Sequence, residues 1–182
     1  MFSRSTWLIL ALAALAATAG AWLQHESRRA HVPPGVQVIG VGDRAPDIAL
    51  MDTTGHVRRL SDFRGHRVVL NFWATWCGPC LDEMPALTKV QATQGPDGAR
   101  IVGIAMDDPA RVRAFLASHP VNYPVLLGQL AWPSTSLRFG DTAAVLPYSV
   151  LLDAKGQVRA VRRGPLDAAL LRAWLAPAPS PH

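Results

Sequence analysis

The residues best suited to chemistry are Cys77 and Cys80, the only two cysteines in the 182-residue chain. They lie in the segment Trp76-Cys77-Gly78-Pro79-Cys80, separated by a Gly-Pro dipeptide. Two thiols at this spacing can close a disulfide and can exchange it with a disulfide of another protein through a mixed-disulfide intermediate. The motif therefore predicts a pair that alternates between dithiol and disulfide.

Three other uses of a cysteine pair fit the sequence less well. A structural zinc site needs two more ligands, and none of the six histidines forms a spaced pair close to the motif. Covalent haem attachment needs a histidine directly after the second cysteine, where this chain has Leu81. Two inert core cysteines would have no reason to flank Gly78-Pro79. The sequence thus predicts a site with no metal and no bound cofactor.

The elements around the motif predict which thiol is the nucleophile and which is the resolving thiol. Arg67 to Trp73 is a nearly unbroken apolar run, typical of a strand buried on both faces of a sheet. Beyond Cys80, apolar residues recur at helical spacing, at Leu81, Met84, Leu87 and Val90. Cys77 is therefore expected at the start of a helix, where free N–H groups and the helix dipole favour a thiolate. This position predicts Cys77 as the nucleophile and Cys80, one turn later, as the resolving thiol.

Gly78 and Pro79 suit the start of this helix. Glycine relaxes the tight turn from strand to helix, and proline is tolerated in a first turn because its missing N–H costs little there. With Trp76, which is expected to be exposed while Trp73 packs in the core, they form the predicted surface on which a partner protein docks.

The motif resembles a known family. The segment Asn71-Phe72-Trp73-Ala74-Thr75-Trp76-Cys77-Gly78-Pro79-Cys80 looks like a thioredoxin active site. Together with Gly42-Asp43-Arg44-Ala45-Pro46 and Glu83-Met84-Pro85, it is similar to the TlpA/ResA family of exported, usually membrane-tethered thiol:disulfide reductases. The resemblance implies an α/β, thioredoxin-like fold over residues 41–176. In that fold helices flank a central mixed β-sheet, with an extra strand–helix insertion and an N-terminal β-hairpin.

The resemblance also implies roles for residues outside the cysteine motif. Thioredoxin carries a buried aspartate six residues before its first cysteine, where this chain has Asn71. Glu83, one turn beyond Cys80, is therefore the candidate proton acceptor, whereas Asp82 should point away. The simpler alternative is that Glu83 only favours the dipole of its helix.

Leu146-Pro147 precedes a predicted strand, and the matching proline of thioredoxin-like folds is cis and faces the disulfide. Such a proline would expose the Leu146 backbone to an incoming peptide, which could lie against it like an added strand. The alternative is an ordinary trans turn before a strand.

The N-terminal segment of the chain predicts export. In residues 1–23, the stretch Trp7 to Leu23 is uncharged and mostly apolar, close to the minimum length of about 17 residues for a membrane span. We expect a retained membrane anchor, although cleavage as a signal peptide after Ala19 would also fit. Residues 24–40 are a predicted tether and residues 177–182 a loose tail. Either way the domain is expected on the periplasmic side of a bacterial inner membrane.

Between these ends the pattern predicts the remaining elements of one domain. They are a hairpin over Asp47 to Leu60, a strand over Ile101 to Met106, a helix from Asp108-Pro109, a strand over Pro124 to Leu127, a short helix over Ser134 to Phe139, a hairpin of Tyr148 to Leu152 with Gln157 to Arg163, and a last helix opened by Gly164-Pro165.

The function predicted from these features is an exported reductase of protein disulfides. The resemblance implies apocytochrome c as one partner and a membrane thiol reductant as electron donor. The net charge of +5 invites a nucleic-acid interpretation, but the 18 Lys and Arg residues are scattered, so no nucleic-acid partner is expected. A disulfide oxidase or isomerase of the same fold is the alternative. A peroxiredoxin-like peroxidase fits less well, because Ala74 stands where such enzymes need threonine.

Overall fold

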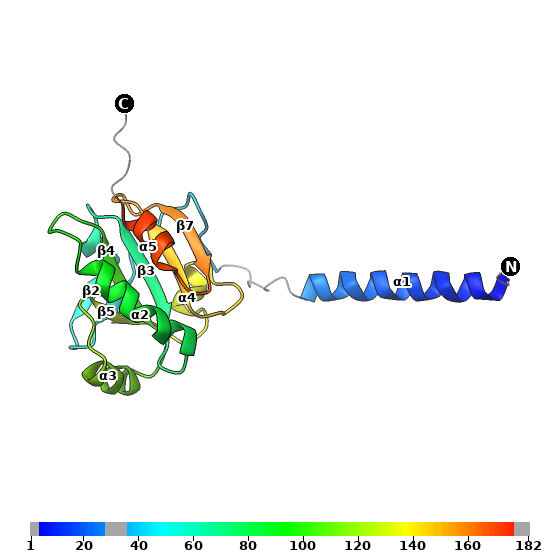
Figure 1. The fold of residues 1–182 in the computed structure, drawn as a ribbon, viewed down its shortest axis with the longest axis horizontal. Coiled ribbons are helices and arrows are strands. Elements are labelled where there is room, and N and C mark those ends of the chain that lie inside the picture. The colour runs from blue at the N-terminus through cyan, green and yellow to red at the C-terminus, as the bar shows by residue number, and fades with distance from the viewer. Residues whose placement is uncertain (1–3, 28–35, 177–182) are drawn as a thin grey trace, which may run out of the picture. The chain divides into compact units, whose positions relative to one another are not determined.

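The computed structural model describes residues 4–27 and 36–176. The chain divides into two units, Met1–Pro34 and Gly35–His182, which are considered separately (Figure 1). The predicted tail, and the part of the predicted tether from 28 to 35, lie outside the described residues.

The first unit contains one helix, α1 (Arg4–Ser27), within its described residues. It runs four residues past the predicted segment 1–23, into the predicted tether. No helix in the described part of the chain is both long and apolar enough to cross a membrane.

The second unit is built on a five-stranded mixed sheet in the order β5-β4-β3-β6-β7 (Figure 1). Three strands run parallel, β3 with β4 and β4 with β5, whereas β6 and β7 are antiparallel to their neighbours. The strands are β3 (Val68–Trp73), β4 (Arg100–Ala105), β5 (Val125–Leu127), β6 (Tyr148–Leu152) and β7 (Val158–Arg163). The sheet confirms the predicted fold class, including β7 as an edge strand.

Alternate residues of β3 enter two separate apolar clusters, because successive side chains of a strand point to opposite faces. On one face, Val69 and Trp73 pack with residues of α2 (Gly78–Gln91), α3 (Pro109–Ser118) and α5 (Ala168–Leu175). On the other face, Leu70 and Phe72 pack with residues from the hairpin of β1 (Ala49–Met51) and β2 (Val57–Arg59), the 3-10 helix η1 (Leu60–Phe63) and the segment after the short α4 (Thr135–Arg138).

The predicted N-terminal hairpin and strand–helix insertion are both present. β1 and β2 pair antiparallel, and α3 connects the parallel strands β4 and β5. Asp108 caps α3 as predicted, accepting hydrogen bonds from the backbone N–H groups of Ala110 and Arg111. The residues before the predicted start of the domain at Val41 also contact it, since the Ile39 N–H donates to the Arg138 carbonyl at 3.2 Å.

The start of the last helix was predicted too early. α5 begins at Ala168 rather than at Gly164-Pro165, because the Asp167 side chain accepts a hydrogen bond from the Leu170 N–H and so caps the helix. Gly164 instead bonds through its N–H to the Pro147 carbonyl at 2.8 Å.

The strand directions bring several loops to one edge of the sheet. The carboxyl ends of β3, β4 and β5 share an edge because these strands are parallel. β6 starts at the same edge, since Tyr148 pairs with Phe72 near the end of β3. This one edge, which we call the active edge, therefore carries the loop from β3 to α2 with the cysteine motif at the start of α2, and the loops that contain Asp107, the segment 128–134 and Leu146-Pro147.

Candidate active site

The two cysteines form a disulfide at the start of α2, with their Cα atoms 5.3 Å apart. Cys77 is the N-cap residue, and its carbonyl accepts the N–H groups of Cys80 at 3.0 Å and Leu81 at 3.1 Å. Cys77 is 5% exposed and Cys80 is fully buried. This order of exposure fits the predicted roles of nucleophile and resolving thiol.

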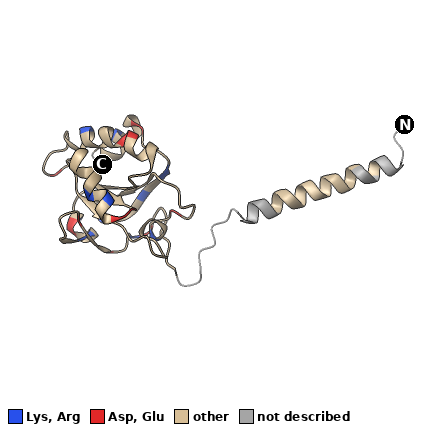
Figure 2. Ribbon diagram, turned by 90° about the horizontal axis from the view of Figure 1, so that it is seen from below, with Lys and Arg blue, Asp and Glu red and all other residues tan. Residues whose placement is uncertain are grey.

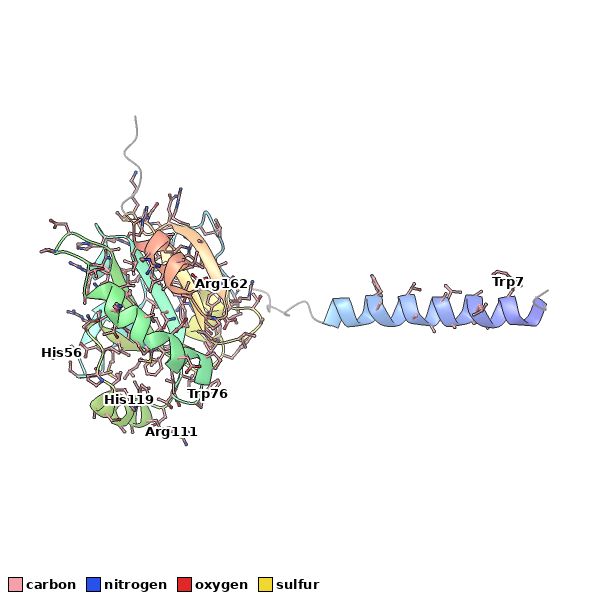
Figure 3. The ribbon with its side chains drawn as sticks, viewed as in Figure 1. Trp7, His56, Trp76, Arg111, His119 and Arg162 are labelled. Carbon is pink, nitrogen blue, oxygen red and sulfur yellow. A yellow bond between two sulfur atoms is a disulfide. The ribbon has the colours of Figure 1, made fainter. Side chains whose placement is uncertain are left out.

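The surface around the disulfide is formed by the residues predicted for docking. Trp76 is 67% exposed and projects from the active edge, while Trp73 is fully buried, as expected (Figure 3). Gly78 and Pro79 are also exposed. Two exposed apolar residues at the same edge, Leu130 and Trp132, were not anticipated.

Glu83 is a buried carboxylate on the second turn of α2, held by two hydrogen bonds. Its Oε1 accepts from Asn71 Nδ2 and its Oε2 from the Leu166 N–H, both at 2.7 Å. Burial raises the pKa of Glu83, although both hydrogen bonds act to lower it. Asp82 is exposed, as predicted. Asn71, which replaces the usual aspartate, thus serves as a donor to a carboxylate on the neighbouring helix.

The surroundings of Glu83 include other buried polar atoms. Asn71 Nδ2 also donates to Ser149 Oγ at 3.1 Å. Within the described residues, Asn71 Oδ1, Trp73 Nε1 and the Tyr123 hydroxyl have no hydrogen-bond partner. Burial and the charge of Glu83 both raise the pKa of Tyr123. Glu83 therefore lies in a buried polar patch rather than in a purely apolar pocket.

Leu146-Pro147 is a cis peptide bond, as the resemblance implied. Pro147 is buried, whereas Leu146 is half-buried and contacts both apolar clusters. A second cis bond, Trp132-Pro133, was not predicted. Both lie on loops at the active edge, on opposite sides of β3 in the strand order.

Asp107 is the site residue that the sequence interpretation missed. It is 6% exposed, and its Oδ2 accepts hydrogen bonds from both the backbone N–H and the hydroxyl of Thr75. A signal was available, since Asp107 directly follows an apolar run predicted to be a buried strand. The carboxyl end of a parallel strand is a common position for functional residues in α/β sheets.

Comparison with known proteins now decides the family. A model described as the AhpC/TSA family matches residues 41–161. The chain belongs to this family. The thiol-disulfide oxidoreductase ResA of Geobacillus kaustophilus is 33% identical over 127 residues, which are 69% of this chain and 71% of that protein. This similarity confirms the TlpA/ResA resemblance.

Solved structures of thiol-disulfide proteins have a similar fold. A Chlorobium tepidum structure assigned as the thiol:disulfide interchange protein DsbE is 32% identical, with a TM-score of 0.65 over 76% of this chain and 99% of that one. A secreted thiol-disulfide isomerase from Corynebacterium glutamicum is 26% identical, with a TM-score of 0.63 over 80% and 93% of the two chains. These neighbours confirm the thioredoxin-like fold.

The raised pKa of Glu83 predicts how stability depends on pH. The folded protein binds the Glu83 proton more tightly than the unfolded chain, whose pKa is near the ordinary 4.5. The stability due to this preference is fully present below that value and is lost as pH rises through the higher folded pKa. The free energy of unfolding of the wild type should therefore fall with rising pH relative to that of Glu83→Gln.

Urea unfolding of the oxidised full chain between about pH 4 and pH 8 measures this difference. Asp82→Asn, which removes an exposed carboxylate next to Glu83, is the matched control and should follow the wild-type profile. Parallel pH profiles for wild type and Glu83→Gln would contradict the assignment.

Proposed function

We propose that this chain is an exported thiol–disulfide oxidoreductase that reduces disulfides of partner proteins with its Cys77–Cys80 pair. The observation that carries the proposal is the Cys77–Cys80 disulfide at the start of α2, in a chain that belongs with thiol-disulfide oxidoreductases. The N-cap position supports Cys77 as the nucleophile, because a thiolate is stabilised there by the helix dipole and by free N–H groups.

The exchange proceeds in two steps. The Cys77 thiolate attacks one sulfur of the partner disulfide, forming a mixed disulfide and releasing a partner thiolate that takes up a proton. Cys80 then loses its proton and attacks the Cys77 sulfur, which releases the second partner thiol and closes Cys77–Cys80. Two electrons pass to the partner, and a membrane thiol reductant supplies two others that reduce the Cys77–Cys80 disulfide again.

Glu83 is proposed as the acceptor of the Cys80 proton. It lies one turn beyond Cys80 on the same helix and is buried, as Cys80 is. Its raised pKa brings it closer to neutral pH, where a group can both accept and return a proton efficiently. Asn71 and the Leu166 N–H would hold the carboxylate in place during this cycle.

The partner polypeptide is proposed to dock on the active edge. Trp76, with Gly78 and Pro79, offers an exposed aromatic and backbone surface beside the disulfide. The segment Leu146-Pro147, directly before β6, would pair with an extended partner segment. The TlpA/ResA resemblance supports apocytochrome c as one such partner.

A second candidate function is disulfide isomerisation or oxidation. The Corynebacterium glutamicum neighbour, which is described as a thiol-disulfide isomerase, favours it. The Gly-Pro dipeptide between the cysteines favours a reductant instead, since thioredoxin, with a potential of about −270 mV, shares it.

The activity itself is tested with the purified full chain. It should reduce insulin disulfides when dithiothreitol is supplied, and Cys77→Ser should abolish this activity because the nucleophile is gone. Peroxide turnover should not exceed that of the Cys77→Ser control. Peroxidase activity that depends on Cys77, without insulin reduction, would overturn the reductase assignment.

The partner is tested by trapping. Cys80→Ser leaves the first step intact and blocks the second, so mixed disulfides with true partners should accumulate on non-reducing gels of envelope fractions. Cys77→Ser should trap little, because the remaining thiol at Cys80 is fully buried. Apocytochrome c among the trapped proteins supports the maturation role. If Cys77→Ser were the better trap, the roles of the two thiols would be reversed.

Export is proposed to depend on residues 1–23, retained as an anchor or cut after Ala19. The secreted Corynebacterium neighbour supports the compartment. Alkaline phosphatase fused after Leu60 should be active, because that enzyme folds only where disulfides form. Mass spectrometry of the native protein then distinguishes the two fates, since an N-terminus at Gly20 indicates cleavage. An inactive fusion would contradict export.

A further inference from the structure

Asp107 connects the end of β4 to the loop that carries the nucleophile. The Thr75 N–H donates to Asp107 Oδ2 at 3.0 Å, and the Thr75 hydroxyl donates to the same oxygen. The other oxygen, Oδ1, accepts from the Asp108 N–H at 2.7 Å. One carboxylate thus receives three hydrogen bonds, two of them from a residue only two positions before Cys77.

The bonds of Asp107 fall on a tight turn. The Cys77 N–H donates to the Ala74 carbonyl at 3.1 Å, so Thr75 and Trp76 are the two central residues of a turn that ends at the nucleophile. Just before it, the Met106 N–H donates to the Trp73 carbonyl at 2.7 Å. Asp107 therefore adds one more connection beyond the β3–β4 pairing and holds the turn at Thr75.

The carboxylate of Asp107 is charged at neutral pH. Burial acts to raise its pKa, but the hydrogen bonds from Thr75 and Asp108, with the charge of Arg111, outweigh burial and leave the pKa lowered. Arg111 and Trp76 both lie at the lower end of the domain in Figure 3. The buried carboxylate of Asp107 therefore places a negative charge in contact with the turn that ends at Cys77.

We propose that Asp107 is a positioning residue that holds the Ala74–Cys77 turn through Thr75 and whose negative charge disfavours the Cys77 thiolate. A less stable thiolate makes the reduced pair less stable, so the pair gives up its electrons more readily. Asp107 thereby makes the Cys77–Cys80 pair a stronger reductant of partner disulfides. This inference rests on the proposed function of the Cys77–Cys80 pair and adds the group that sets its direction.

The role of the charge separates this proposal from a purely structural one. Asp107→Asn removes the charge, and its amide cannot satisfy all three donors, because one orientation turns its NH₂ toward Thr75 and the other toward Asp108. Some loss of stability is thus expected under either interpretation. Only the electrostatic role also changes the Cys77 pKa and the redox equilibrium.

The test measures two properties of the reduced and oxidised full chain that need no partner protein. The first is the pKa of Cys77, from the pH dependence of iodoacetamide alkylation, and the second is the equilibrium of the pair with glutathione. In Asp107→Asn the Cys77 pKa should fall, and the equilibrium should shift toward the reduced protein by on the order of tenfold, as expected for one nearby charge in a partly buried site.

Asp108→Asn is the matched control. Asp108 is the adjacent carboxylate, but it is exposed and caps α3, a role that asparagine fills equally well. Its Cys77 pKa and glutathione equilibrium should equal those of the wild type. An Asp107→Asn protein that only melts earlier, with both properties unchanged, would overturn the proposal.

Thr75→Val covers the case in which Asp107→Asn does not fold. It keeps the charge of Asp107 but removes one hydrogen bond that compensates it, so the Cys77 pKa should rise and the equilibrium should shift toward the disulfide. An unchanged Cys77 pKa in Thr75→Val would also overturn the proposal. Wild-type insulin reduction is measured in parallel, and its absence would overturn the reductase function without bearing on the Cys77 pKa.

Discussion

The domain depends on one strand that is buried throughout. All six residues of β3 are at most 3% exposed, and the strand is paired along its length with β4 on one side and β6 on the other. Its apolar side chains must be covered on both faces, which requires helices on one side and the hairpin with η1 on the other. The disulfide motif follows this strand directly, so a strand buried along its whole length positions the reactive pair.

Two buried carboxylates, Glu83 and Asp107, lie near that motif, and their environments move their pKa values in opposite directions. Glu83 receives two hydrogen bonds, which do not outweigh its burial, so its pKa is raised. Asp107 accepts three hydrogen bonds and also interacts with the positive charge of Arg111, so its pKa is lowered. One group is thereby suited to exchange a proton, and the other to remain a fixed charge. Basic and acidic residues are otherwise spread around the domain (Figure 2).

The active edge combines these groups with an apolar surface. Trp76, Leu130 and Trp132 are exposed on loops that follow β3 and β5. Exposed aromatic residues beside a reactive group are typical of surfaces that bind other proteins. A partner that reaches the disulfide would therefore meet these apolar side chains around it, whereas Glu83 and Asp107 are buried.

The sequence alone determined the local features of this protein. An apolar run, a Gly-Pro dipeptide between cysteines and helical spacing after Cys80 are short-range patterns, and each led to the correct element. The strand–helix–strand unit from β4 to β5 was predictable for the same reason, because a parallel pair needs a crossover. The family was also recognisable from the sequence, since its motif is contiguous.

Only the tertiary structure decided which distant residues act together. The hydrogen bonds of Asn71 to Glu83 and of Asp107 to Thr75 join residues on different elements, 12 and 32 positions apart. The start of α5 depended on Asp167 rather than on the glycine and proline before it. Sequence patterns report which face of an element is buried, but a hydrogen bond between elements depends on register and packing, which are set when the whole sheet assembles.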